Sequence, residues 1–141
     1  MEVSDVRRRV REAMERAKRR PAERKTRNDE ATRDYEQFLQ RIAVPLFRQI
    51  GNVLRAEGHT FTVSTPGSGV RLTSDRSGDY MELRLDTEGP TPQVMIHSTR
   101  GRGSRVIDSE SPIGAGVPIA SLAEEDVLVP VLTELEPFVE R

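Results

Sequence analysis

Arginines in a glycine-rich stretch are the first residues of this sequence whose type and spacing could do chemistry. The stretch STRGRGSR, residues 98–105, alternates small residues with Arg100, Arg102 and Arg105. Guanidinium groups bind phosphate through paired N–H donors, so the stretch could contact nucleic acid or another anion. A phosphate-binding loop needs a third glycine and a following helix, whereas this stretch leads into an expected strand. The pattern therefore favours a solvated hairpin turn, with anion contact as the alternative.

A second basic group lies near the N-terminus. Its members are Arg7, Arg8, Arg9, Arg11, Arg16, Lys18, Arg19 and Arg20. A helix carrying these residues could bind the phosphates of nucleic acid, with an affinity that falls steeply as salt rises. Glu12 and Glu15 interrupt the basic run, and no aromatic residue is present there to stack on bases. A solvated helix or a coiled-coil flank is the favoured interpretation, and nucleic-acid contact is the alternative.

A third candidate is the polar face of a predicted sheet. Strand alternation places His97 on the face that points away from the core, near Arg71, Glu82, Arg84 and Arg105. These side chains could form a ligand-binding surface. More often such a face is solvated and carries charge pairs between neighbouring strands, and we favour that interpretation.

The residues do not form a recognisable catalytic or metal-binding pattern. Asp75, Ser77, Asp79 and Asp86 have the spacing of a calcium loop, but Tyr80 stands where that loop requires glycine. The chain has no cysteine and only two histidines, which are far apart in the sequence. We therefore expect no catalytic residue, no cofactor and no metal ion, and an enzyme is the least favoured function class.

Charge is distributed unevenly along the chain. Residues 1–34 hold twelve Lys or Arg and eight Asp or Glu, whereas residues 121–141 hold one and six. Hydrophobic residues make up 35% of the chain and charged residues 32%. We therefore expect part of the chain to have no apolar face packed in a core. The absence of cysteine and of an apolar N-terminal stretch favours a soluble, cytoplasmic protein that does not contact a membrane.

The first 34 residues are predicted to form a charged helical arm or linker. A narrow apolar stripe follows helical spacing in residues 1–20, and its members are Val3, Val6, Val10, Ala13 and Ala17. Pro21 is expected to interrupt this helix. Residues 22–34 have almost no large apolar side chains, and we expect a solvated helix there rather than a disordered linker.

A second, wider stripe predicts the first core helix over residues 35–57, ending near Gly58. Pro45 is expected either to kink this helix or to begin a new one. A closing helix is predicted after the capping-box pattern of Ser121 and Glu124. Pro130 should kink or split that closing helix.

Between these helices, short alternating runs predict strands over residues 59–65, 70–73, 80–86 and 93–99, with a weaker fifth over 105–108. The connections are short and rich in Gly, Pro, Ser and Asp, which favours an antiparallel meander. Residues 109–120 are expected to form an ordered loop.

Together these elements predict an α+β fold. Its four- to five-stranded antiparallel meander is covered on one face by two helices, with the arm over residues 1–34 and the domain over 35–141. We expect a non-enzymatic interaction or assembly module that binds a protein partner or forms a weak homodimer. The alternative is a nucleic-acid-associated protein that uses the basic arm.

Overall fold

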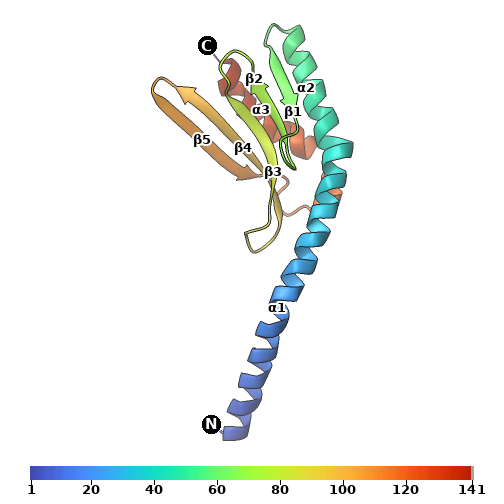
Figure 1. Ribbon diagram of the computed structural model, residues 1–141, viewed down its shortest axis with the longest axis vertical. Helices are drawn as coiled ribbons and strands as arrows, with labels where there is room; N and C mark the ends of the chain where they lie inside the picture. Colours follow the sequence, from blue (N-terminus) through green and yellow to red (C-terminus); the bar gives the residue numbers. More distant parts are fainter. Residues whose placement is uncertain (141) are drawn as a thin grey trace.

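The computed structural model describes residues 1–140 and has the predicted α+β architecture (Figure 1). The helices are α1 (Val3–Phe38), the π-helical turn η1 (Leu39–Ala43), α2 (Val44–Ala56), the 3-10 turn η2 (Ile119–Ser121) and α3 (Glu124–Val139). The strands are β1 (Phe61–Ser64), β2 (Val70–Ser74), β3 (Tyr80–Asp86), β4 (Gln93–Arg102) and β5 (Arg105–Pro112). Each strand pairs with the next in antiparallel fashion, so the sheet is an open five-stranded meander with β3 in the centre.

The core lies between one face of this sheet and the helices. Alternate residues of the strands point into it, and Leu72, Met81 and Leu83 are completely buried. Helix α2 packs against β1 and β2, and α3 packs against β4. The last turns of α1 add Tyr35 and Phe38 to the same core. The predicted meander and its cover by two helices are therefore confirmed.

Helix α1 is longer than predicted, because Pro21 lies inside it without ending it. The prediction of an interruption at Pro21 was wrong. Proline removes one backbone hydrogen bond, but residues 22–38 are rich in good helix formers. The C-terminal end of the helix is also fixed to the domain by buried Tyr35 and Phe38. Residues 22–34 are helical, as expected.

A wide helical turn accommodates Pro45 at the junction of α1 and α2. In η1 the Val44 N–H donates to the Leu39 carbonyl, one residue further back than in an α-helix. Pro45 then lies in the first turn of α2, where its missing N–H is not needed. The extra residue in this turn shifts the helical phase, so that Leu39, Ala43 and Phe47 all face the core.

The C-terminal third differs from the prediction in two boundaries. Strand β5 continues to Pro112, so residues 109–112 extend the β4–β5 hairpin instead of forming a loop. Helix α3 begins at Glu124, and Ser121 belongs to the preceding η2 turn, so the predicted Ser121 capping box is wrong. The Asp126 carboxylate instead accepts the Ala123 N–H at 2.8 Å.

Helix α3 is continuous through Pro130, which the sequence analysis expected to kink or split it. Val127, Val131 and Leu135 fix the helix to the core on both sides of that proline. The stabilisation from burying these three side chains offsets the loss of the one backbone hydrogen bond that Pro130 cannot make.

Candidate functional site

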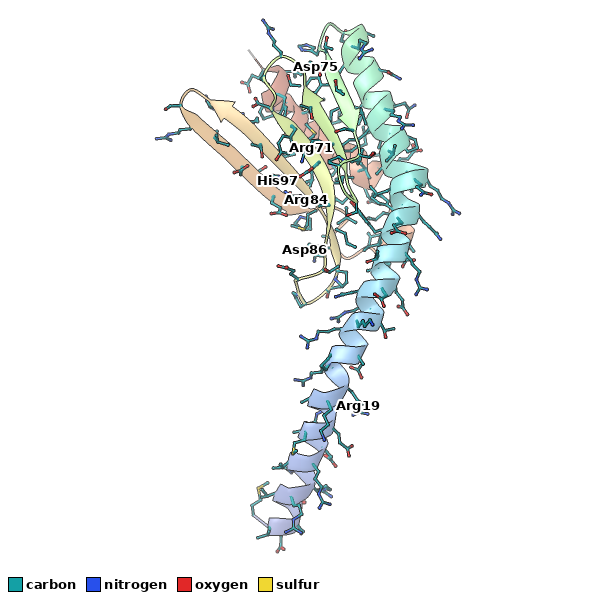
Figure 2. The ribbon with its side chains drawn as sticks, in the orientation of Figure 1. Arg19, Arg71, Asp75, Arg84, Asp86 and His97 are labelled. Atoms are coloured by element: carbon teal, nitrogen blue, oxygen red, sulfur yellow. The ribbon has the colours of Figure 1, made fainter. Side chains whose placement is uncertain are left out.

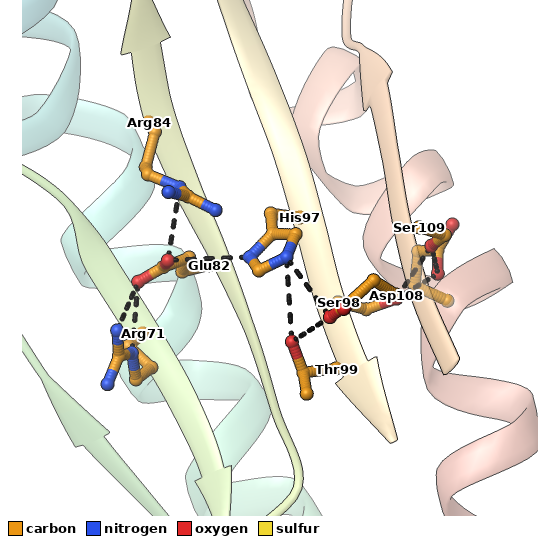
Figure 3. Close-up of polar contacts among 9 residues, drawn as sticks. Arg71, Glu82, Arg84, His97, Ser98, Thr99, Asp108 and Ser109 are labelled. Carbon is orange, nitrogen blue, oxygen red and sulfur yellow. Dashed lines mark hydrogen bonds and ion pairs between the residues drawn. The ribbon is translucent and has the colours of Figure 1, made fainter. Parts of the chain in front are cut away.

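The four predicted sheet-face residues come together as one cluster, here called the sheet-face cluster (Arg71, Glu82, Arg84 and His97) (Figures 2 and 3). Strand register produces this arrangement. Arg71 on β2 lies opposite Glu82 on β3, and Glu82 lies opposite His97 on β4. Arg84 follows Glu82 by two residues, so it points to the same face. This face is the one opposite the helices.

Glu82 is the centre of the cluster, and only 6% of its side chain is exposed. Arg71 donates to Oε2 through Nε and Nη2, both at 2.9 Å. Arg84 Nε lies 3.1 Å from Oε1. Buried carboxylates are tolerated when paired in this way. Because both oxygens are occupied by guanidinium groups, Glu82 is not positioned as a free proton acceptor.

His97 is held more loosely than Glu82. Its Nδ1 lies 3.5 Å from Glu82 Oε1, and no group among residues 1–140 forms a hydrogen bond with this buried nitrogen. Its Nε2 lies 3.5 Å from both Asp108 Oδ1 and Thr99 Oγ1 (Figure 3). The Thr99 hydroxyl instead donates to Asp108 at 2.7 Å. These distances are too long for an assembled proton relay.

The guanidinium group of Arg71 also lies 4.0 Å from the centre of the Tyr80 ring, a cation–π contact. The exposed side-chain fractions of Arg71 and Arg84 are 32% and 48%, so both keep some N–H donors in water. The cluster can therefore contact an anionic group of a ligand or partner. Its main effect within the fold is to join β2, β3 and β4 across the open face.

Arg105 is absent from the sheet-face cluster, although the sequence analysis placed it near His97. The register of β5 places Glu110 opposite His97 and Arg105 opposite Arg102. Gly103 and Ser104 form the two-residue turn of this hairpin, and Gly103 has a φ of 63°. The expected hairpin turn is therefore present, and anion contact by these arginines stays a prediction. Arg100 and Arg102 line a groove with Phe138 and Glu140, at the C-terminal end of α3.

The basic N-terminal residues lie on a part of α1 that leaves the domain, here called the projecting segment (residues 3–27) (Figure 1). Near its C-terminal end, Pro21, Arg24, Lys25 and Arg27 line a hollow with the β3–β4 turn (residues 87–90). No residue of this segment is buried within the described chain, and the first buried residue of α1 is Ala31. At 1.5 Å per residue, the segment is about 37 Å long.

The projecting segment presents an apolar stripe to water. Val3, Val6, Val10 and Met14 follow helical spacing, and their exposed fractions are 75%, 44%, 51% and 53%. The same spacing continues through Ala17 and Pro21 toward the buried Ala31 and Tyr35. The stripe is thus an extension of the face by which α1 packs on its own domain. Sequence reasoning missed Met14, although its spacing from Val10 is helical.

Two basic rows flank this stripe, one on each side of the helix. One row contains Arg7, Arg11, Lys18 and Lys25, and the other contains Arg9, Arg16, Arg20 and Arg27. By the same helical spacing, the opposite face carries Asp5, Glu12, Glu15 and Glu23, together with Arg8 and Arg19. Arg19 is labelled in Figure 2. Arg8 forms an ion pair with Asp5 on this face, at 2.7 Å. The projecting segment has eleven basic and four acidic residues, a balance of +7.

Sequence reasoning also missed a polar contact that fixes α3 to the β4–β5 hairpin. The Glu134 carboxylate accepts hydrogen bonds from Ser98 Oγ at 2.8 Å and from Ser109 Oγ at 3.1 Å. Ser98 and Ser109 lie opposite each other in the sheet register. Only the pairing of Ser98 with Ser109 could have indicated this contact. That pairing could not be predicted, because residues 109–112 were expected to form a loop rather than part of β5. With Glu134 held inward, the opposite face of α3 points to solvent.

Within residues 1–140, no group of three or more metal-ligating side chains is present, and no helix is long and apolar enough to cross a membrane. Comparison of the chain with protein-family models, curated proteins and solved structures finds no match.

Proposed function

We propose that this protein is a non-enzymatic interaction or assembly module whose projecting segment docks on an acidic, partly apolar surface of a protein partner. One observation carries the proposal. Four large apolar side chains of the segment (Val3, Val6, Val10 and Met14) are held in water, with a basic row on each side of them.

The physical chemistry of isolated helices supports this function. In proteins most helical stability comes from packing of an apolar face, and the apolar face of this segment is uncovered. Burying a Val or Met side chain completely is worth about 1.5–3 kcal/mol. The basic rows would select a surface with carboxylates close to its apolar part, and would repel a basic one. The exposed segment is therefore suited to bind a partner.

The sheet-face cluster supports a non-enzymatic function. Its buried carboxylate is engaged by Arg71 and Arg84, and its histidine lies 3.5 Å from the nearest acceptors. The cluster would at most add an anion contact to the docking surface. We further propose that the protein acts in the cytoplasm, because a chain without cysteine cannot form the disulfides that oxidising compartments allow.

A pull-down with matched variants tests the proposal. Immobilised full-length protein would be exposed to the same protein in solution and, separately, to a cell extract. We expect retention of one or the other, and we expect Val6→Asp with Val10→Asp to abolish it. Arg8→Ala with Arg19→Ala is the matched control, since both residues lie on the opposite face of the helix. Retention that is equal for the wild type and the stripe variant would overturn the proposal.

Nucleic-acid binding is the second candidate function, and the balance of +7 over the projecting segment favours it. If six or more phosphates are contacted, affinity for duplex DNA should fall about 10³-fold or more between 50 and 200 mM salt. Changing Arg7, Arg8, Arg9 and Arg11 to Glu should abolish binding, whereas Val6→Asp should have little effect. A gel shift measures this. Absence of a shift at 50 mM salt would exclude this candidate.

A further inference from the structure

We infer that the partner is a second copy of this chain, and that the projecting segment of one copy binds the outer face of α3 in the other. This inference rests on the proposed function, because it names the surface on which the segment docks. It identifies two surfaces of one molecule that complement each other in charge and in apolar pattern.

The outer face of α3 has the properties that the projecting segment requires. Val129 and Leu132 are 56% and 46% exposed on this face. Glu125, Glu136 and Glu140 are exposed beside them, at helical spacing. Helix α3 contains five acidic residues and no Lys or Arg. It therefore presents an apolar strip accompanied by carboxylates.

The projecting segment is long enough to span the outer face of α3. Helix α3 has 16 residues and is about 24 Å long, which is shorter than the projecting segment of about 37 Å. The apolar stripe can lie along Val129 and Leu132 while arginines from a basic row reach the glutamates beside them. Ion pairs at the rim of such a contact steer association and fix its register.

Direct pairing of two projecting segments is less favourable than binding to α3. The stripe has a basic row on both sides, so two copies packed stripe to stripe would place like charges beside each other in either orientation. Like charges at close range are destabilising. An acidic helix removes this repulsion and replaces it with attraction.

The segment also cannot reach α3 of its own chain. Helix α1 is continuous, so Met14 lies about 26 Å along the helix from Ala31, where packing on the domain begins. The contact must therefore form between molecules. Each copy contributes one segment and one α3, so a twofold dimer contains the contact twice.

Charge reversal on each surface, with mixing, tests the inference. The first variant carries Arg9→Glu, Arg16→Glu and Arg20→Glu, and the second carries Glu125→Arg, Glu136→Arg and Glu140→Arg. All six side chains are exposed, so both variants should fold like the wild type. We expect a dimer for the wild type at 50 mM salt, monomers for each variant alone, and a heterodimer for the equimolar mixture. Sedimentation velocity measures these masses.

The control carries Glu36→Arg with Glu57→Arg, two exposed carboxylates outside both α3 and the projecting segment, and should leave the mass of the dimer unchanged. A monomeric wild type, an α3 variant that keeps the wild-type mass, or a mixture that stays monomeric would each overturn the inference. If the wild type is monomeric but retains an extract protein through its stripe, the proposed function stands and this inference alone fails.

Discussion

Tyr35 contacts the central strand β3 from the helix side of the sheet, whereas Glu82 of β3 points to the opposite face, and the polar group of each is buried with a partner. The Tyr35 hydroxyl donates to the Leu83 carbonyl at 3.3 Å, which connects the base of α1 to β3. Burial raises the pKa of Tyr35 above the usual tyrosine value, and the negative charge of Glu82 raises it further. Glu82 itself forms ion pairs with Arg71 and Arg84.

Tyr35→Phe tests the consequence for alkaline stability. The folded state keeps a proton that the unfolded chain releases above about pH 10, so the free energy of unfolding should fall as pH rises past that value. This one proton contributes a slope of up to about 1.4 kcal/mol per pH unit. The variant lacks that contribution, so its deficit relative to the wild type should shrink between pH 8 and pH 11. Urea unfolding measures the difference, and a constant deficit would contradict the account.

Leu83→Ala tests the core at the same scale. Leu83 is completely buried in β3, on the same face of the strand as Met81 and Leu85. The substitution should lower the free energy of unfolding by about 2–5 kcal/mol, from lost burial and the cavity left behind. Val106→Ala, at a position 67% exposed on β5, is the control and should change little. A thermal melt unaffected by Leu83→Ala would show that the packing of β3 is misassigned.

At the scale of elements, one continuous apolar stripe of α1 is buried at one end of the helix and exposed at the other. Its last turns contribute Ala31, Tyr35 and Phe38 to the domain core. Its first turns present the same stripe to solvent, flanked by the basic rows. The transition falls near Asn28, within the helix, so the part of the chain that projects is shorter than the arm predicted over residues 1–34.

A chain truncated to residues 28–141 should therefore remain folded. It keeps Ala31, Tyr35 and Phe38, together with both core helices and every strand. We expect a cooperative thermal melt within a few degrees of the full-length protein, combined with loss of self-association. Circular dichroism and sedimentation measure the two properties. Unfolding of the truncated chain would mean that the projecting segment stabilises the domain core.

The strands and core helices could be predicted from the sequence because alternation and helical spacing are local signals. Pro21 and Pro130 were given too much weight, since a proline removes one hydrogen bond while anchored neighbours keep a helix continuous. Met14 and most members of the two basic rows precede Pro21, so their alignment could be read from the helix expected over residues 1–20; only Lys25 and Arg27 required the helix to continue. The sheet-face cluster was predictable in membership, but the burial of Glu82 required the register of β2, β3 and β4.

At the scale of the whole molecule, the opposite charges at the two ends of the sequence lie on two separate helices. The projecting segment carries the positive balance on a helix that leaves the domain, and α3 carries the negative balance on the domain surface (Figure 1). Both helices also expose apolar side chains. This layout is the basis of the inferred contact between the projecting segment of one copy and α3 of another.

Cysteine cross-linking most directly tests whether the projecting segment docks on α3 of a second copy, because the natural chain has no thiol to interfere. One preparation would carry Val10→Cys on the stripe, and the other Leu132→Cys on α3. Their oxidised mixture should give a disulfide-linked heterodimer. Replacing Val10→Cys by Arg8→Cys, on the opposite face of the helix, should reduce the yield at least tenfold. Equal yields from the two positions, or linkage of Val10→Cys only to itself, would contradict the docking of the projecting segment on α3.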